Sequence, residues 1–202
     1  MNKLVSSLVA AVLVIAVSVR YFDLRIAHFI LEYTGRDFQF SHAISGMPDM
    51  LLVIVIALSM FSWTGYFLLS GKGISDRRTL LFQVLGSSLP AAYAAKDLLK
   101  WLFGRVNTRL WLAEPDAYAF HWFHGSQDFR GFPSGHMLVL TPIFLALCHF
   151  SPRFRLPALI LWLGMAAALM VTEYHFLGDV IAGGYAGFLI HYAADRYFRR
   201  AP

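Results

Sequence analysis

Long apolar runs are the feature of this sequence that most constrains its fold. They cover residues 4–19, 50–70, 79–95, 137–150, 156–172 and 176–194. Several reach the roughly 17 to 25 residues that an α-helix needs to cross a bilayer. The run at 137–150 is short, but a helix that begins near Ser134 would reach the lower limit of that range. We therefore predict an all-α fold, a polytopic membrane bundle of about six transmembrane helices.

The composition supports a membrane protein and argues against a nucleic-acid-binding one. Hydrophobic residues make up 58% of the chain and charged residues 14%, which is too apolar for an ordinary soluble domain. The 17 Lys and Arg residues lie in short clusters between apolar runs, without a basic face or a reader motif. With no internal repeat or linker, residues 1–202 are predicted to form a single integral-membrane domain. Cys148, the only cysteine, is interpreted as a packing residue.

The N-terminal segment has two interpretations. Lys3, an apolar stretch and small residues near Ser18 are compatible with a cleaved signal peptide, but we predict an uncleaved helix. Residues 21–48 mix charged and apolar side chains, as in an interfacial amphipathic helix followed by a loop.

Basic residues predict the orientation, because Lys and Arg near span ends are retained on the cytoplasmic side. Six spans would place 9 basic residues on the side of the two termini and 8 on the other side, so the count alone does not decide. The connections on the first side are short and basic, whereas five of the other eight charges lie between Lys96 and Arg130. A binding site in that long connection would account for them. We therefore predict cytoplasmic termini and outward-facing chemistry, in a bacterial inner membrane.

Two neighbouring segments have the composition of a phosphate site. Residues 96–109 carry a mixed set of Lys and Arg, which suits a phosphoryl group, although headgroup anchoring would also explain these cations. Further along, Ser134 is a candidate helix cap directly before Gly135 and His136. Free amides at such a helix start form an anion pocket that glycine lets a ligand approach. His136 would stand beside that pocket.

His175 and Asp179 are four residues apart and would share one helix face. An aspartate that holds one ring nitrogen leaves the other free to act as base or nucleophile. The alternative is a structural pair that braces two helices. Of the other histidines, His121 and His124 have no clear role, and four are interpreted as packing or interface residues: His28, His42, His149 and His191.

These segments, taken in order, resemble the type 2 phosphatidic acid phosphatase superfamily. The first family motif is a Lys, six residues and Arg-Pro, often with Gly-Arg just ahead, and Lys100 and Gly104-Arg105 match it. The second, Pro-Ser-Gly-His, is matched in full by residues 133–136. The third is Ser-Arg, five residues, His, three residues and Asp, and His175 and Asp179 match it. The resemblance covers residues 100–184.

The sequence also departs from the family pattern at two places. Asn107-Thr108 stand where Arg-Pro is expected, and Ala168-Leu169 stand where Ser-Arg is expected. Two family arginines are therefore missing. Arg109 is the candidate to replace the first, and Arg130 is a second candidate.

The resemblance implies a mechanism and a set of site residues. His175 would attack phosphorus and form a phosphohistidine, Asp179 would orient its ring, and His136 would protonate the leaving group. The implied substrate-binding residues are Lys100, Arg105, Ser134, Gly135 and Arg109. The resemblance implies neither a metal nor another cofactor.

The predicted function is a lipid phosphatase that hydrolyses a phosphomonoester or a diphosphate of a lipid. A phosphotransferase using the same histidine is an alternative that only product analysis would separate. A transporter or assembly protein, in which these polar residues brace helices, is the alternative from another class. Nothing in the sequence specifies an oligomeric state.

Overall fold

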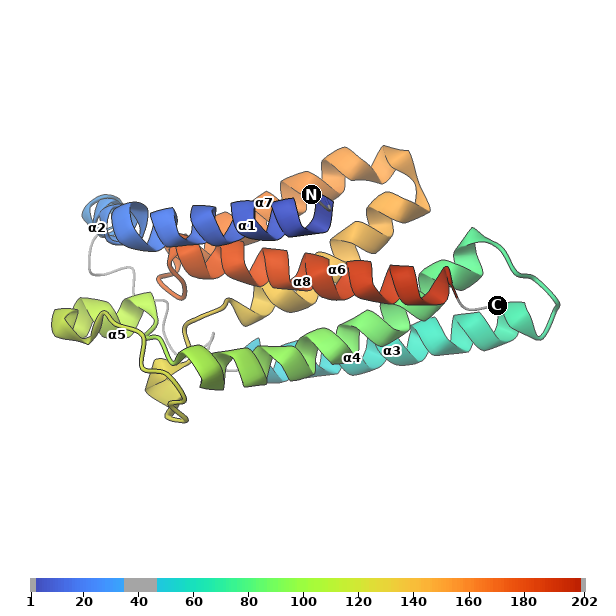
Figure 1. Cartoon of the computed structure of the whole chain (residues 1–202), viewed down its shortest axis with the longest axis horizontal. Helices are drawn as coiled ribbons and strands as arrows, with labels where there is room; N and C mark the ends of the chain where they lie inside the picture. The colour runs from blue at the N-terminus through green and yellow to red at the C-terminus, as the bar shows by residue number, and fades with distance from the viewer. Residues whose placement is uncertain (1–2, 35–46, 201–202) are drawn as a thin grey trace.

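The computed structural model describes residues 3–34 and 47–200, and every regular element in them is helical. This confirms the predicted all-α class. The main helices, shown in Figure 1, are α1 (Lys3–Val17), α2 (Asp23–Thr34), α3 (Met47–Ser70), α4 (Arg77–Phe103), α5 (Thr108–Ala113), α6 (Gly135–Phe150), α7 (Arg155–Val171) and α8 (Leu177–Phe198). His42, one of the histidines interpreted above, lies outside the described residues.

Three described helical stretches are long and apolar enough to cross a membrane: Lys3–Tyr33, Met50–Ser70 and Pro152–Val171. They leave large apolar side chains exposed along much of their length, as expected for surfaces that contact lipid. The other predicted spans correspond to α4, α6 and α8, and α6 is a shorter apolar helix. The count of six spans stays a prediction.

The N-terminal helix continues further than the sequence indicated. Between α1 and α2 the chain forms a turn of π-helix at Ser18–Phe22, so that Lys3–Tyr33 is one helical stretch. Such π-turns often occur at functional sites. Asp23 follows this turn and is 1% exposed, although most of the surrounding helix is open.

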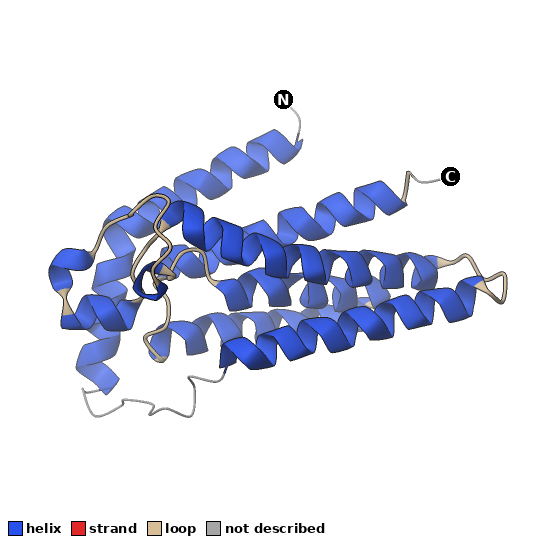
Figure 2. Ribbon diagram, turned by 90° about the horizontal axis from the view of Figure 1, so that it is seen from below, coloured by secondary structure: helices blue, strands red, loops and turns tan. Residues whose placement is uncertain are grey.

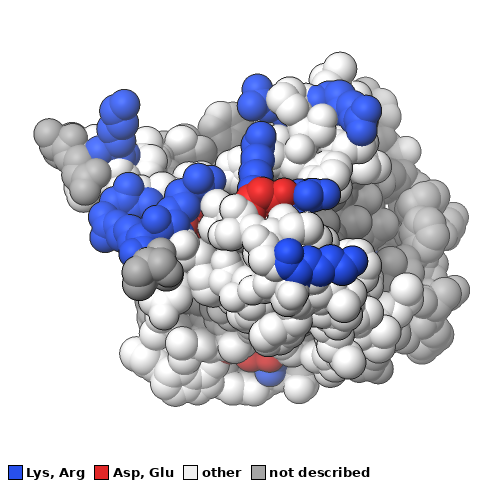
Figure 3. Space-filling model, turned by 90° about the vertical axis from the view of Figure 1, so that its right-hand side faces the viewer, with Lys and Arg blue, Asp and Glu red and all other residues white. Residues whose placement is uncertain are grey.

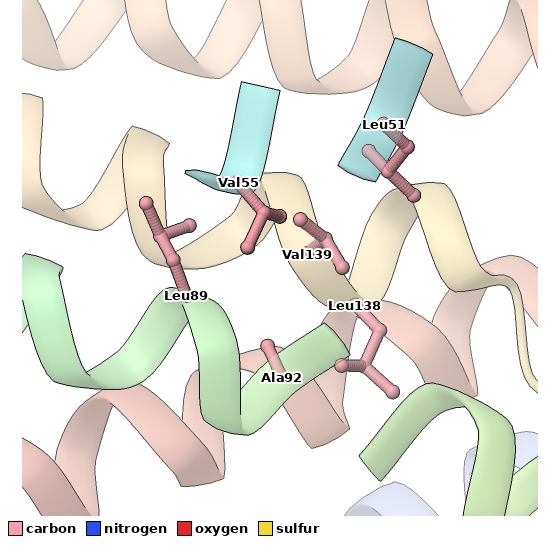
Figure 4. Close-up of a cluster of buried hydrophobic side chains, with 6 residues drawn as sticks. All are labelled: Leu51, Val55, Leu89, Ala92, Leu138 and Val139. Carbon is pink, nitrogen blue, oxygen red and sulfur yellow. The ribbon is translucent and has the colours of Figure 1, made fainter. Parts of the chain in front are cut away.

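One apolar core lies between α3, α4 and α6, and Figure 4 shows its six buried side chains. They are Leu51, Val55, Leu89, Ala92, Leu138 and Val139. The apolar faces of these three helices therefore pack together. This packing positions the end of α4 and the start of α6.

Helix α4 is longer than its apolar run at 79–95. It begins at a capping box formed by Asp76 and Thr79 and ends at Gly104, whose φ of 50° lies in the left-handed region. A Cβ at Gly104 would lie 2.0 Å from the carbonyl oxygen of His121, so this position requires glycine. Lys96 and Lys100 therefore lie on the last turns of a helix, not in the connection that the sequence suggested.

The long helices run lengthwise, and their connections gather at two ends (Figures 1 and 2). One end carries α5, the long connection before α6 and the turn between α7 and α8. The opposite end carries the α3–α4 connection and the last described residues of α8. The motif segments belong to the first end.

Candidate active site

The three motif segments meet where α4 ends and where α6 and α8 begin. The backbone N–H of Ser134 donates to the carbonyl oxygen of Asp179 at 2.9 Å, which ties the second motif to the third. A Cβ at Gly135 would lie 2.7 Å from Cδ of Lys96 and 3.5 Å from Cε of Lys100. The lysines of α4 therefore lie directly against the start of α6, as the phosphate-site prediction requires.

The start of α6, where an anion pocket was predicted, carries Ser134 and His136. Ser134 caps the helix, and its side-chain oxygen accepts a hydrogen bond from the backbone of Met137 at 3.5 Å. Ser134 itself is fully buried, and His136 in the first turn is partly exposed. His175, Lys100 and Lys96 all act electrostatically on the His136 ring. The structure thus brings both predicted catalytic histidines and a lysine together.

His175 lies in the turn between α7 and α8 and is only 6% exposed. Its Nδ1 is 3.6 Å from Oδ2 of Asp179, which is longer than a hydrogen bond, and it has no other hydrogen-bond partner. Catalytic hydrogen bonds are often long in an unliganded site and tighten when substrate binds. The carboxylate faces Nδ1, and the backbone of Gly131 is a further polar neighbour of the ring.

Burial lowers the pKa of His175 from its ordinary value of 6.5, and nearby Asp179 opposes part of that shift. The ring is therefore neutral at pH 7. A neutral imidazole has a lone pair on one nitrogen, which is the form that a nucleophile requires.

Asp179 has no exposed surface, and both of its side-chain oxygens are bonded. Oδ2 accepts from the backbone N–H of Phe176 at 3.0 Å, and Oδ1 accepts from Nη1 of Arg105 at 2.6 Å. The first bond belongs to the capping of α8, and the second is charge-assisted. Helix capping and an ion pair together fix the carboxylate that faces His175.

Arg105 was predicted to bind substrate, but the structure surrounds it with protein partners. It is 1% exposed, and its Nη2 donates to Oδ2 of Asp23 at 2.8 Å and to the hydroxyl of Tyr118 at 2.6 Å. The rings of Tyr118, Phe120 and Phe176 pack around the guanidinium. In this geometry Arg105 supports Asp179 and presents no open face to a phosphate.

Arg109 is also occupied by protein groups. Its Nε and Nη2 donate to the carbonyl oxygen of Thr172 at 3.2 and 2.9 Å, and its guanidinium lies over the Tyr174 ring. Arg109 therefore braces the turn that carries His175. Its guanidinium is not free, so these contacts give no support to its predicted role as a phosphate ligand. That role stays a prediction.

The two positions where the family has arginine are filled in other ways. Asn107 caps α5, where its side chain accepts from the backbone of Leu110 at 2.8 Å. Leu169 is 5% exposed and belongs to a buried cluster with Met137, Ala166 and Val180. Neither position offers a cation.

Three other cations gather near His136. Lys96 and Arg130 both act electrostatically on Lys100, and Asp97 lies among them. Arg130 forms an ion pair with Asp97, and Nζ of Lys96 lies 3.7 Å from the same carboxylate oxygen. Arg130 and Lys100 are both partly exposed, whereas Lys96 is buried.

Sequence reasoning missed two residues of this region. Lys96 was noted as a cation but was not assigned to the site, although it is one helical turn from Lys100. Asp23 was not singled out at all. An acidic residue in an apolar helix is a functional candidate by default, and that rule would have identified it.

Comparison with known proteins agrees with the motif assignment. Residues 80–201 match the model of the PAP2 superfamily. The chain belongs to the PAP2 superfamily. The matched range includes all three motif segments. No solved structure is a significant match.

Two curated PAP2-type relatives are named Lipid A 1-phosphatase. The protein from Rhizobium etli is 31% identical over 150 residues, which is 69% of this chain and 62% of the relative. The protein from Rhizobium johnstonii is 35% identical over 150 residues, covering 69% of this chain and 59% of the relative. The matched segment therefore spans about three fifths of each relative's length. With its apolar helices, the chain is an integral membrane protein with bacterial relatives.

Proposed function

We propose that this PAP2 protein is a membrane lipid phosphatase that works through a phosphohistidine on His175. The observation that carries the proposal is the arrangement of His175 itself. The ring is buried and neutral, Asp179 faces one ring nitrogen, and His136 and Lys100 lie on the other motif segments beside it. A nucleophile, an orienting carboxylate and a second proton-transfer group are the parts that covalent catalysis needs.

The proposed reaction has two steps. In the first, His136 starts in its protonated form, which the bound phosphate anion favours. The lone pair on Nε2 of His175 attacks phosphorus, the bond from phosphorus to the lipid oxygen breaks, and His136 gives that oxygen its proton. In the second, His136 removes a proton from water, the resulting hydroxide attacks phosphorus, and the nitrogen–phosphorus bond breaks. Inorganic phosphate leaves, and both histidines return to their starting states.

The phosphate would be held by cations and backbone amides. Lys100 and the backbone amide of Gly135 supply positive potential at the start of α6, whereas the amide of Ser134 is bonded to Asp179 and is not free for phosphate. Lys96 and Arg130 add two further cations beside Lys100. Charge on the equatorial phosphoryl oxygens is where most catalysis of phosphoryl transfer arises, so a cluster of this kind suits the reaction.

The relatives suggest which substrate to test first. Two of them are named Lipid A 1-phosphatase, so the phosphate on lipid A heads the panel, followed by other lipid monophosphates and diphosphates. The reaction is proposed to need no metal. Among the described residues, no three His, Cys, Asp or Glu side chains form a group that could hold one.

The proposed orientation places the site outside the cytoplasm and both termini inside, in the inner membrane. Figure 3 shows Lys and Arg gathered at the end opposite the site, where Arg77, Arg78 and Arg199 lie. A basic end is retained preferentially in the cytoplasm. Reporter fusions at the C-terminus test this: a cytoplasmic reporter should be active and an exported one silent, and the reverse result would overturn the orientation.

The experiment that tests the function is phosphate release by detergent-purified protein in the presence of a chelator. Wild type, His175→Ala and His149→Ala are compared on the lipid panel. His149 is a matched control because it is an exposed histidine on the same helix as His136, about 20 Å further along α6.

We expect release by wild type and by His149→Ala, and none by His175→Ala. Release that persists in His175→Ala would contradict the proposal and favour a non-catalytic role in transport or assembly. Consumption of a lipid phosphate without free phosphate, together with a newly phosphorylated lipid, would identify a phosphotransferase instead.

A further inference from the structure

Asp23 is a buried acid far from the motifs in sequence, and the proposed mechanism does not yet use it. It lies on the N-terminal helix, outside the segment at 80–201 that matches the family. Its Oδ1 accepts from the backbone N–H of Gly178 at 2.8 Å, next to Asp179. Its Oδ2 accepts from Nη2 of Arg105 at 2.8 Å. Asp23 thus contacts both the start of α8 and the arginine that holds Asp179.

The three buried side chains form one charge network. Arg105 donates to Asp179 from Nη1 and to Asp23 from Nη2, so a single guanidinium bridges two carboxylates. The hydroxyl of Tyr118 accepts from Arg105 and donates to the carbonyl oxygen of Val19 at 2.8 Å. Burial raises the pKa of Tyr118 to about 12, so this phenol is neutral and adds no charge. With Asp23 and Asp179 both ionised against one Arg105, the network carries one net negative charge.

That net charge matters for His175. When Nε2 of His175 bonds to phosphorus, positive charge develops on the imidazole ring beside Asp179. Arg105 is bonded to Asp179 at 2.6 Å, so by itself it would cancel the negative charge that the ring needs. Asp23 neutralises Arg105 from the other side. Electrostatic interactions are strong in a buried site, so the balance between these groups acts directly on the ring.

We propose that Asp23 is a positioning residue of the catalytic site, which neutralises Arg105 so that Asp179 keeps an effective negative charge facing His175. The N-terminal helix is then part of the catalytic machinery. Arg105 holds Asp179 in place, and Asp23 removes the electrostatic penalty of that support. This inference rests on the proposed function, since it assigns Asp23 to the step in which His175 acts as nucleophile.

The competing explanation is that Asp23 only anchors the N-terminal helix to α8. The two explanations differ in what a second substitution does. If charge balance is the role, Asp23→Asn leaves Arg105 able to cancel Asp179, and Arg105→Gln added to it restores the net negative charge. If anchoring is the role, the second substitution removes another contact and makes the defect worse.

The experiment measures kcat, KM and thermal unfolding on the lipid monophosphate that wild type hydrolyses. The variants are Asp23→Asn, Asp23→Asn with Arg105→Gln, and His175→Ala. Tyr185→Phe is the anchoring control, because Tyr185 on α8 bonds to Ser7 on α1 at 3.0 Å and lies outside the charge network. Removing a group that orients a functional histidine from one step away lowers activity by roughly 10- to 100-fold, and we expect that loss in kcat for Asp23→Asn, with KM unchanged.

The double variant should have a higher kcat than Asp23→Asn, and Tyr185→Phe should match wild type. The inference is overturned if Asp23→Asn keeps the wild-type kcat, or if the double variant is folded and as inactive as His175→Ala. If Asp23→Asn does not fold, the folded double variant still decides, because charge balance predicts that it retains activity. Release that survives in His175→Ala would overturn the proposed function itself, and this inference with it.

Discussion

Replacing Gly183 by alanine should force apart the two helices that carry the proposed catalytic groups. Gly183 lies on α8 against the segment that begins α6. An added Cβ would lie 2.3 Å from the carbonyl oxygen of Ser134, 3.1 Å from its carbonyl carbon and 3.2 Å from Cβ of Met137. Non-bonded heavy atoms rest near 3.5 Å, so Ser134 must move by about 1 Å. The atom that blocks the methyl group is backbone, so a side-chain rotation cannot relieve the contact.

This movement should affect the rate more than the stability. The backbone of Ser134 is bonded to Asp179, and His136 follows two residues later, so a shift of Ser134 moves His136 relative to His175. A misplacement of about 1 Å costs on the order of 100-fold in rate. Overpacking costs about 1–3 kcal/mol in the free energy of unfolding, and the better helix propensity of alanine offsets up to about 1 kcal/mol of this.

The assay is phosphate release together with thermal unfolding in detergent, with Gly164→Ala as the matched control. Gly164 is a helical glycine on α7, and an added Cβ there would have no atom within 4 Å apart from its chain neighbours and the backbone of its own helix. Gly164→Ala should keep the wild-type rate and unfold at the same temperature or slightly higher. A Gly183→Ala protein with the wild-type rate would refute the claim that α6 and α8 must approach this closely for catalysis.

Three further predictions concern His175, Arg130 and Arg109. In an NMR titration of histidine rings, with the signal assigned by its loss in His175→Asn, His175 should become charged below pH 6.5, because burial lowers its pKa; a midpoint at or above that value would contradict the neutral nucleophile. Arg130→Gln should raise KM by roughly 10- to 100-fold, as expected for losing a charged hydrogen bond of about 1.5–3 kcal/mol. Arg109→Gln should instead lower the unfolding temperature and leave KM unchanged, since Arg109 bonds to Thr172; the opposite pattern would make Arg109 the phosphate ligand.

Helices were predictable here because their signals are local. The apolar runs at 50–70 and 176–194 correspond closely to α3 and α8, and Ser134 was recognised as the cap of α6. The end of α4 was not found, because Lys96 and Lys100 resemble a polar connection although lysine favours helices. Helix α4 ends at Gly104, which packs against His121. The sequence does not reveal this contact.

Part of the site was also predictable from spacing. His175 and Asp179 face each other, but the predicted shared helix face is wrong, because His175 lies in the turn before α8 and only Asp179 is on the helix. The partners of the arginines were not predictable from spacing, because they are distant in sequence. Arg105 bonds to Asp23 across 82 residues, and Arg109 bonds to Thr172 across 63. Contacts of that range depend on how the helices pack. An arginine in a motif therefore looked like a phosphate ligand, whereas packing makes it a partner of carboxylates or carbonyls.

The central claim is that His175 carries the phosphoryl group, and trapping it tests this most directly. Wild-type protein is mixed with the lipid phosphate that it hydrolyses, quenched in alkali within its first turnovers, and digested for mass spectrometry. Phosphohistidine survives alkali and is lost in acid, which separates it from a phosphoserine on Ser134. We expect one alkali-stable phosphoryl group on His175, and none in His175→Ala. A rapid release of phosphate with no phosphoryl group on His175 at any quench time, or a group on another residue, would contradict it.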